Sequence, residues 1–159
     1  MEPFRPNYGK RPPRLSRIFD HLRPFYFVTF NTRNRTPVLA TPANHEAFVT
    51  FCEKALERDI AVGRYVLMPD HIHLFVVFPE ADMTLTRWVH ILKTVLGKKL
   101  AEAGIPLPHW QEGFFDHLLR QSESYGQKWE YVRKNPVRAG LCETPEDWPY
   151  QGEISRVEF

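Results

Sequence analysis

The sequence predicts an α+β protein with a ferredoxin-like split βαβ fold, in which helices pack on one face of an antiparallel sheet. Strand-like and helix-like segments follow one another in the order β-α-β-β-α-β, and an extra amphipathic helix comes after the last strand. A chain of 159 residues, 43% of them hydrophobic, can bury a full core without disulfides or a metal. One domain is therefore expected.

The first strand and the first helix are each marked by their residue pattern. Residues 25–31 (FYFVTFN) are mostly aromatic and β-branched, which favours an extended strand. Between Asn44 and Asp59, apolar residues recur at the three- and four-residue spacing of one helix face. A β-α unit therefore opens the fold.

Two apolar strands follow directly. Residues 61–68 (AVGRYVLM) and 71–78 (HIHLFVVF) are separated only by Pro69 and Asp70, a connection short enough for a hairpin. We expect these two strands to pair antiparallel.

A second helix and a fourth strand complete the predicted sheet. Apolar residues follow a helical period from Leu85 to Leu100, and this helix is expected to end before Gly104 and Pro106. Residues 114–120 (FFDHLLR) then predict the fourth strand.

The last helix is the additional one. Ser124 and Gln127 have the spacing of a capping box, which predicts a helix that starts there. We expect it to run at least to Asn135, where Pro136 ends or kinks it.

Charge is distributed unevenly along the chain. Residues 1–41 hold eight basic and two acidic residues, a net charge of +6, whereas the remainder holds 13 basic and 17 acidic residues, a net charge of −4. Four prolines among the first 18 residues predict an extended basic arm instead of regular structure. Such an arm fits a polyanion, and a solvated chain end is the alternative that charge alone leaves open.

Nothing in the sequence predicts a membrane segment or a secretion signal. No apolar stretch approaches the roughly 20 residues that span a bilayer, and the first ten residues lack an apolar signal core. We therefore expect a cytoplasmic protein with no membrane partner.

A pair of histidines interrupts the apolar third strand. Alternation along the strand places His71 and His73 on one sheet face and Ile72 on the other. Two parallel neutral imidazoles can bind one divalent cation and leave positions for water or substrate. Hydrogen-bonded histidines are the alternative, but replacing two apolar positions costs burial energy that packing alone does not explain.

The last helix carries a second pair of polar residues. Tyr125, Trp129 and Val132 form its predicted buried stripe, whereas Tyr131 and Asn135 lie on a polar face as i,i+4 neighbours. The phenol and the amide can therefore converge on one point, although an ordinary surface tyrosine and a helix-ending asparagine would show the same pattern.

Four segments in order carry a resemblance to a known family. They are MPDHIHLFVVFP (residues 68–79), WQEGFFDHLLR (110–120), YVRKNPVRAGL (131–141) and DWP (147–149). Together they closely resemble the REP-associated tyrosine transposases of the HUH superfamily, which are single-strand DNA nucleases with one catalytic tyrosine. The resemblance divides the chain into a basic arm (1–22), a catalytic domain (23–151) and a tail (152–159).

The resemblance implies a role for each of the paired residues. His71 and His73 would bind a divalent metal, Mg²⁺ or Mn²⁺, and Tyr131 would be the nucleophile that forms a 5′-phosphotyrosine. Asn135 falls where insertion-sequence relatives have a glutamine that completes the metal site, so it would bind the metal directly or through water.

The resemblance also implies the DNA partner. The expected substrate is single-stranded DNA beside imperfect REP hairpins, bound by a monomer or a homodimer. The basic residues expected to contact DNA phosphates are Lys10, Arg11, Arg14, Arg33, Lys93, Arg133, Lys134 and Arg138.

Two other functions remain open at the level of sequence. The first is a non-catalytic single-stranded nucleic-acid binding module on the same fold, although no strand has the aromatic and glycine pattern of RNA recognition motifs. The second is a metal-dependent phosphoesterase that activates water, with His109 or His117 beside His71 and His73. Two-histidine-motif phosphoesterases need a second H-x-T/S element, which this sequence lacks.

Overall fold

The computed structural model describes residues 23–79, 83–120 and 122–157. The basic arm that we expect at residues 1–22, with Lys10, Arg11 and Arg14, lies outside the described residues.

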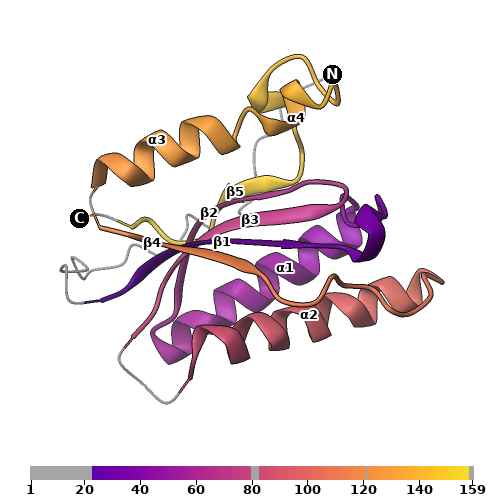
Figure 1. Cartoon of the computed structure of the whole chain (residues 1–159), viewed down its shortest axis with the longest axis horizontal. Coiled ribbons are helices and arrows are strands. Elements are labelled where there is room, and N and C mark those ends of the chain that lie inside the picture. Colours follow the sequence, from indigo (N-terminus) through magenta and orange to yellow (C-terminus); the bar gives the residue numbers. More distant parts are fainter. Residues whose placement is uncertain (1–22, 80–82, 121, 158–159) are drawn as a thin grey trace.

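An antiparallel sheet forms the centre of the described chain (Figure 1). Its strands are β1 (Phe25–Asn31), β2 (Ala61–Leu67), β3 (His71–Val77), β4 (Phe115–Leu119) and β5 (Gln151–Glu153). Their order across the sheet is β4-β1-β3-β2-β5, and each neighbouring pair is antiparallel. The first four strands have the arrangement of a split βαβ fold, so the predicted fold class is confirmed.

The helices lie on the two faces of this sheet. The α-helices are α1 (Pro42–Ala55), α2 (Leu85–Glu102), α3 (Ser122–Val132) and α4 (Asn135–Arg138). The short 3₁₀ helices are η1 (Arg33–Arg35), η2 (Leu56–Arg58) and η3 (Pro145–Asp147). Figure 1 shows α1 and α2 together on one side of the sheet and α3 on the other.

Strand β3 supplies both layers of the core. Ile72 and Leu74 are fully buried in the cluster that contains the apolar residues of α1 and α2. Phe75 and Val77 point the opposite way and belong to the cluster that contains Tyr125 of α3. The period of two along a strand accounts for this division.

Threonine caps fix where the two long helices begin. The hydroxyl of Thr41 accepts a hydrogen bond from the backbone N–H of Asn44, and Pro42 occupies the first turn of α1. The hydroxyl of Thr84 accepts from the N–H of Arg87 in the same way at α2.

Two predictions about the last helix are wrong. Helix α3 begins at Ser122, two residues ahead of the predicted cap at Ser124, so Ser124 lies within the first turn and is not the cap. It ends at Val132 and does not reach Asn135. Pro136 explains this end, since it has no N–H to donate to the carbonyl of Val132 four residues earlier and its ring would clash there.

Strand β5 has no counterpart among the predicted elements. It is only three residues long, polar in sequence, and crosses the boundary that we placed at residue 151 between catalytic domain and tail. The indole N–H of Trp148 donates to the carbonyl of Leu67 at 2.9 Å, and Ile154 and Val157 beyond the strand are buried. Residues 152–157 therefore pack against the rest of the domain through β5 and the buried side chains that follow it.

Among the residues described, no helix combines the length and the apolar character that crossing a bilayer requires.

Acid should destabilise the fold through His45, whose Nε2 lies 2.7 Å from the hydroxyl of the buried Tyr65. Burial lowers the pKa of His45 from 6.5 to about 4, so the unfolded chain binds a proton more readily than the folded chain between these values. The stabilisation is present above pH 6.5 and lost as the pH falls towards 4. We expect the melting temperature of His45→Gln to fall less between pH 7 and pH 4.5 than that of the wild type; an equal fall would contradict this assignment.

Candidate active site

The histidine pair lies at the end of β3, on the sheet face that α3 covers. In the pairing of β1 with β3, Thr29 lies opposite His73 and Asn31 lies opposite His71. The two imidazole rings are 4.7 Å apart between centroids and nearly perpendicular. The prediction that both rings project from one face is therefore confirmed.

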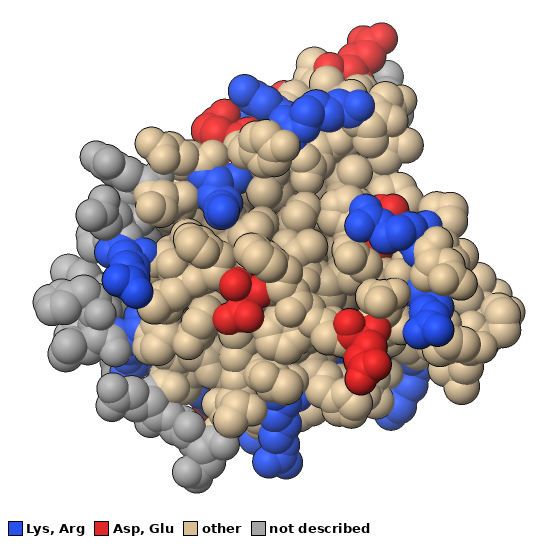
Figure 2. Space-filling model, viewed as in Figure 1, with Lys and Arg blue, Asp and Glu red and all other residues tan. Residues whose placement is uncertain are grey.

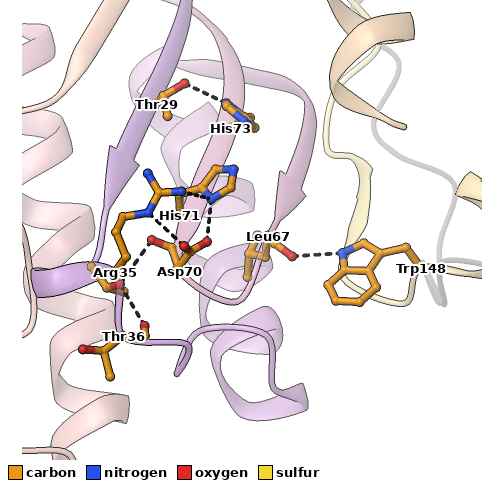
Figure 3. A network of polar contacts seen from close by, with 9 residues as sticks. Thr29, Arg35, Thr36, Leu67, Asp70, His71, His73 and Trp148 are labelled. Atoms are coloured by element: carbon orange, nitrogen blue, oxygen red, sulfur yellow. Dashed lines mark hydrogen bonds and ion pairs between the residues drawn. The ribbon is translucent and has the colours of Figure 1, made fainter. Parts of the chain in front are cut away.

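Neighbouring side chains hold both rings by the same nitrogen (Figure 3). Nδ1 of His71 lies 2.7 Å from Oδ1 of Asp70, and Nδ1 of His73 lies 2.7 Å from the hydroxyl oxygen of Thr29. With a proton on Nδ1, each ring donates to its partner and leaves the lone pair of Nε2 for a ligand.

Arg35 joins this network from η1. Its Nε donates to Oδ2 of Asp70 at 2.8 Å, and its Nη2 lies 3.2 Å from Nδ1 of His71. That ring nitrogen cannot both donate to the carboxylate and accept from the guanidinium. The shorter contact, to a charged acceptor, assigns the proton to Nδ1 and the hydrogen bond to Asp70.

Burial keeps the two imidazoles neutral. It lowers the pKa of His73 to about 3, and nearby positive charges, including those of Arg138 and Lys128, act in the same direction. Burial also lowers the pKa of His71, although the hydrogen bond to Asp70 opposes this. For Asp70, burial would raise the pKa, but hydrogen bonds from Arg35 and His71 outweigh it and lower the pKa. At neutral pH the site therefore holds two neutral imidazoles and one carboxylate.

Tyr125 attaches α3 to the sheet. Its ring packs against Phe25 and Phe75, with centroids 4.9 and 4.8 Å away, and its hydroxyl accepts a hydrogen bond from the N–H of Arg64 at 3.1 Å. The hydroxyl also lies where Gly63 has no side chain, since a Cβ there would be 2.8 Å from the Tyr125 oxygen. The glycine thus allows the close approach of α3 to β2.

Tyr131, in the last turn of α3, borders a cavity. Its side chain is 67% exposed, whereas Val132 beside it is buried, as the predicted helix faces require. The cavity measures about 420 Å³. Its polar lining comes from three segments and consists of His73, His117, Ser124, Gln127, Lys128, Tyr131 and Asn135. The structure therefore brings the tyrosine, one histidine of the pair and the asparagine to the same space.

Arg138 of α4 connects Tyr131 with Asn135. Its guanidinium carbon lies 4.1 Å from the centroid of the Tyr131 ring. Its Nη2 donates to the backbone carbonyl of Tyr131 and to Oδ1 of Asn135. The two residues thus meet across the break between α3 and α4, and not as i,i+4 neighbours on one helix.

The donor set fits a divalent cation with an incomplete protein shell. Within the described part of the chain, no group of three or more His, Cys, Asp or Glu side chains could hold a metal, so a third side-chain donor beside the histidine pair would be of another type. Oδ1 of Asn135 has a second lone pair beyond its bond with Arg138, and Oδ1 of Asn31, beside His71, is buried without a hydrogen-bond partner. Imidazole and amide donors with open positions suit Mg²⁺ or Mn²⁺ together with a phosphate.

Comparison with known proteins identifies the family. The family described as "Transposase IS200 like" matches residues 24–135, more than half of the chain. The chain belongs to the IS200-like transposases. Transposases of this family are generally metal-dependent, in agreement with the donor set.

Two relatives of this chain are named as REP-associated tyrosine transposases. This transposase is 30% identical over 142 residues to a Haemophilus influenzae protein named as a REP-associated tyrosine transposase, covering 79% of the chain and 77% of the relative. It is 28% identical over 127 residues to a REP-associated tyrosine transposase of Escherichia coli, covering 79% and 73%.

Two solved structures of proteins named as transposases also match this chain. A REP-associated tyrosine transposase bound to a REP hairpin matches with a TM-score of 0.64 and 25% identity, over 80% of this chain and 75% of that one. A Deinococcus radiodurans protein named as a transposase matches with a TM-score of 0.51 and 15% identity, over 70% and 90%, which supports the fold alone.

Among the described residues of the transposase, the basic side chains that we expect to contact DNA come from separate elements: Arg33 from η1, Lys93 from α2, and Arg133, Lys134 and Arg138 from the segment after Tyr131. Arg133 pairs with Glu130 and Glu146, and Lys134 lies 3.9 Å from Glu130. Figure 2 shows Lys and Arg side chains spread around the periphery of the face in view, with acidic side chains between them.

Two further expected contacts lie away from the tyrosine. The ammonium of Lys93, on α2, donates to the carbonyls of Gln111 and Gly113. Arg33 lies in η1, and its backbone N–H donates to the carbonyl of His109.

His109 does not join the histidine pair, whereas His117 lines the tyrosine's cavity. His109 is buried, and its Nε2 lies 2.9 Å from the carbonyl of Ile105. Its imidazole is also close to Gly97 of α2, on the opposite side of the sheet from α3.

Sequence reasoning missed four residues of the site, and two of them left a signal. Asp70 directly precedes His71, and Lys128 lies one helical turn before Tyr131. The sequence gives no signal for Thr29 or Arg35. Thr29 lies beside His73 only because β1 pairs with β3, and Arg35 reaches His71 only through the conformation of its loop.

Asp70→Asn should weaken metal binding by about 10- to 100-fold, because the carboxylate fixes the tautomer of His71 and raises its basicity. We would measure the binding of Mn²⁺ to the purified protein by electron paramagnetic resonance of the free ion. Asp59→Asn is the matched control: Asp59 ends η2 in a left-handed conformation that asparagine tolerates, at the opposite end of the sheet. Equal Mn²⁺ affinities for both variants and the wild type would show that Asp70 does not position the ligand.

Proposed function

We propose that this transposase cuts and rejoins single-stranded DNA beside REP-like hairpins, with Tyr131 as the nucleophile. The observation that carries the proposal is the exposed phenol of Tyr131 at a cavity that it shares with His73 and Asn135. The likeness to a REP-associated tyrosine transposase bound to a REP hairpin supports the choice of substrate.

The reaction is a transesterification. The phenol oxygen of Tyr131 attacks the phosphorus of a phosphodiester and gives up its proton, and the bond from phosphorus to the 3′-oxygen breaks. The departing 3′-oxygen takes up a proton, and the 5′-phosphate stays on the tyrosine. A second 3′-hydroxyl can reverse the step and join strands without ATP, because the phosphodiester energy is kept in the tyrosyl ester.

Each side chain of the site has a part in this chemistry. A phenol with an ordinary pKa of about 10 is a weak nucleophile near neutral pH, so the phosphate must be activated. Mg²⁺ or Mn²⁺ held by His71, His73 and Asn135 would withdraw charge from the phosphate oxygens. Asp70 and Thr29 orient the imidazoles, and Arg138 holds the Tyr131 ring from one face.

Tyr131→Phe should abolish the covalent product and leave the fold intact, because the lost hydroxyl belongs to an exposed side chain. We would incubate the protein with a labelled hairpin-flanked single strand and Mn²⁺, and resolve the DNA-linked protein on a denaturing gel. Tyr26→Phe, on the strand face that packs against α1 and α2, is the matched control and should form the adduct. Strand cleavage that survives Tyr131→Phe would instead indicate a metal-activated water.

His73→Ala should likewise abolish cleavage, while hairpin binding stays within about threefold of the wild type, less than 1 kcal/mol. The reason is that the ring serves the reacting phosphate, not the duplex. Binding is measured by fluorescence anisotropy and folding by the melting temperature. Loss of binding together with cleavage, at an unchanged melting temperature, would overturn the assigned role.

A further inference from the structure

Lys128 is a cation at the tyrosine's cavity. Its ammonium lies 5.1 Å from the centroid of the Phe27 ring, and the Phe27 ring stacks on His73 at 5.3 Å with an interplanar angle of 16°. Lys128 also lines the cavity that Tyr131 and His73 border. A cation over an aromatic face is favourable, and the Phe27 ring therefore contacts both the ammonium and the histidine.

The charge of Lys128 is not neutralised by a carboxylate within the described part of the chain. By contrast, the nearby cations Arg133 and Lys134 both lie within ion-pair distance of the Glu130 carboxylate. Lys128 and His73 both line the cavity. The cavity therefore has an uncompensated positive charge near its histidine.

Helix geometry relates Lys128 to the nucleophile. Lys128 and Tyr131 are i,i+3 neighbours in α3, so their Cβ atoms are roughly 5 to 6 Å apart on one face. A phosphate in contact with the phenol oxygen is therefore within reach of the long lysine side chain.

We propose that Lys128 binds a non-bridging oxygen of the phosphate that Tyr131 attacks. The inference rests on the proposed function, in which negative charge on these oxygens must be stabilised during the transfer. A preorganised ammonium in a partly buried cavity stabilises such charge more than the same ammonium in water does. Lys128 thus complements the histidine pair as a substrate-binding residue.

The test is Lys128→Met, which keeps the aliphatic stem over Phe27 and removes the charge. Adduct formation in single-turnover reactions at saturating DNA should fall by about 100-fold, the size expected for one preorganised donor. The slope of log affinity against log salt concentration for a single strand should fall by about 0.7, the value for one phosphate contact. Lys128→Arg should recover most of the rate and the slope.

Lys54→Met is the matched control, since Lys54 is an exposed lysine on α1, on the opposite side of the sheet. It should change neither the rate nor the slope. An unchanged rate and slope in Lys128→Met would overturn the proposal.

A neutral methylphosphonate identifies which phosphate is bound. The cleaved linkage is first located from the DNA end attached to the wild-type protein, and binding is then measured in a Tyr131→Phe background. Placed at that linkage, the methylphosphonate should weaken binding when Lys128 is present and add no loss in Lys128→Met. An equal loss in both would assign Lys128 to another phosphate and overturn the proposal.

Failure of the wild type to form any adduct would reject the proposed function instead. The salt slope would still decide whether Lys128 contacts a phosphate.

Discussion

The alternation of side chains along β3 is the constraint on which the core and the site both depend. Ile72 and Leu74 seal the layer beneath α1 and α2, and the intervening positions place His71, His73 and Phe75 under α3. A shift of pairing by one residue would turn the imidazoles into the apolar layer beneath α1 and α2, and turn Ile72 and Leu74 toward α3. Burial of the apolar residues of β3 therefore fixes the strand register, and this register also fixes the positions of the two candidate metal-binding histidines.

Helix α3 presents its tyrosine because different residues control its two ends. Tyr125 ties the helix to the sheet near its start, and Pro136 forces it to end at Val132. Tyr131 therefore lies in the final turn, where no further turn of helix covers it. Arg138, in the short helix α4, contacts both the ring of Tyr131 and the side chain of Asn135. Tyr131 and Asn135, which helical spacing predicted to be adjacent, are thus linked through Arg138 across the break between α3 and α4.

Most of the fold follows from local pattern. The bounds predicted for β1 match the structure, and those for β2 and β3 differ by one residue, because aromatic and β-branched residues dominate these segments. Strand β5 could not be predicted, since three polar residues form it only by pairing with β2. The end of α3 was predicted three residues too late, because a proline acts on the carbonyl four residues before it as well as on its own neighbour.

The site was predictable where its chemistry is local and not where it depends on distant segments. The histidines and Tyr131 could be predicted as candidates from their positions on a strand and a helix. Arg35 reaches Asp70 across 35 positions of sequence, from a turn in which Asn34 and Arg35 both adopt left-handed backbone. Such a conformation is uncommon for residues other than glycine, so no pattern of side chains indicates it.

Gly63, which has no side chain, affects where α3 and its Tyr131 lie. It lies on β2, which carries none of the residues assigned to the chemistry, yet it leaves the space that the Tyr125 hydroxyl occupies. A Cβ at this position would lie 2.8 Å from the Tyr125 oxygen, so a larger residue requires Tyr125 to shift. The attachment of α3, and with it the position of Tyr131 relative to the histidine pair, therefore depends partly on the absence of a side chain on β2.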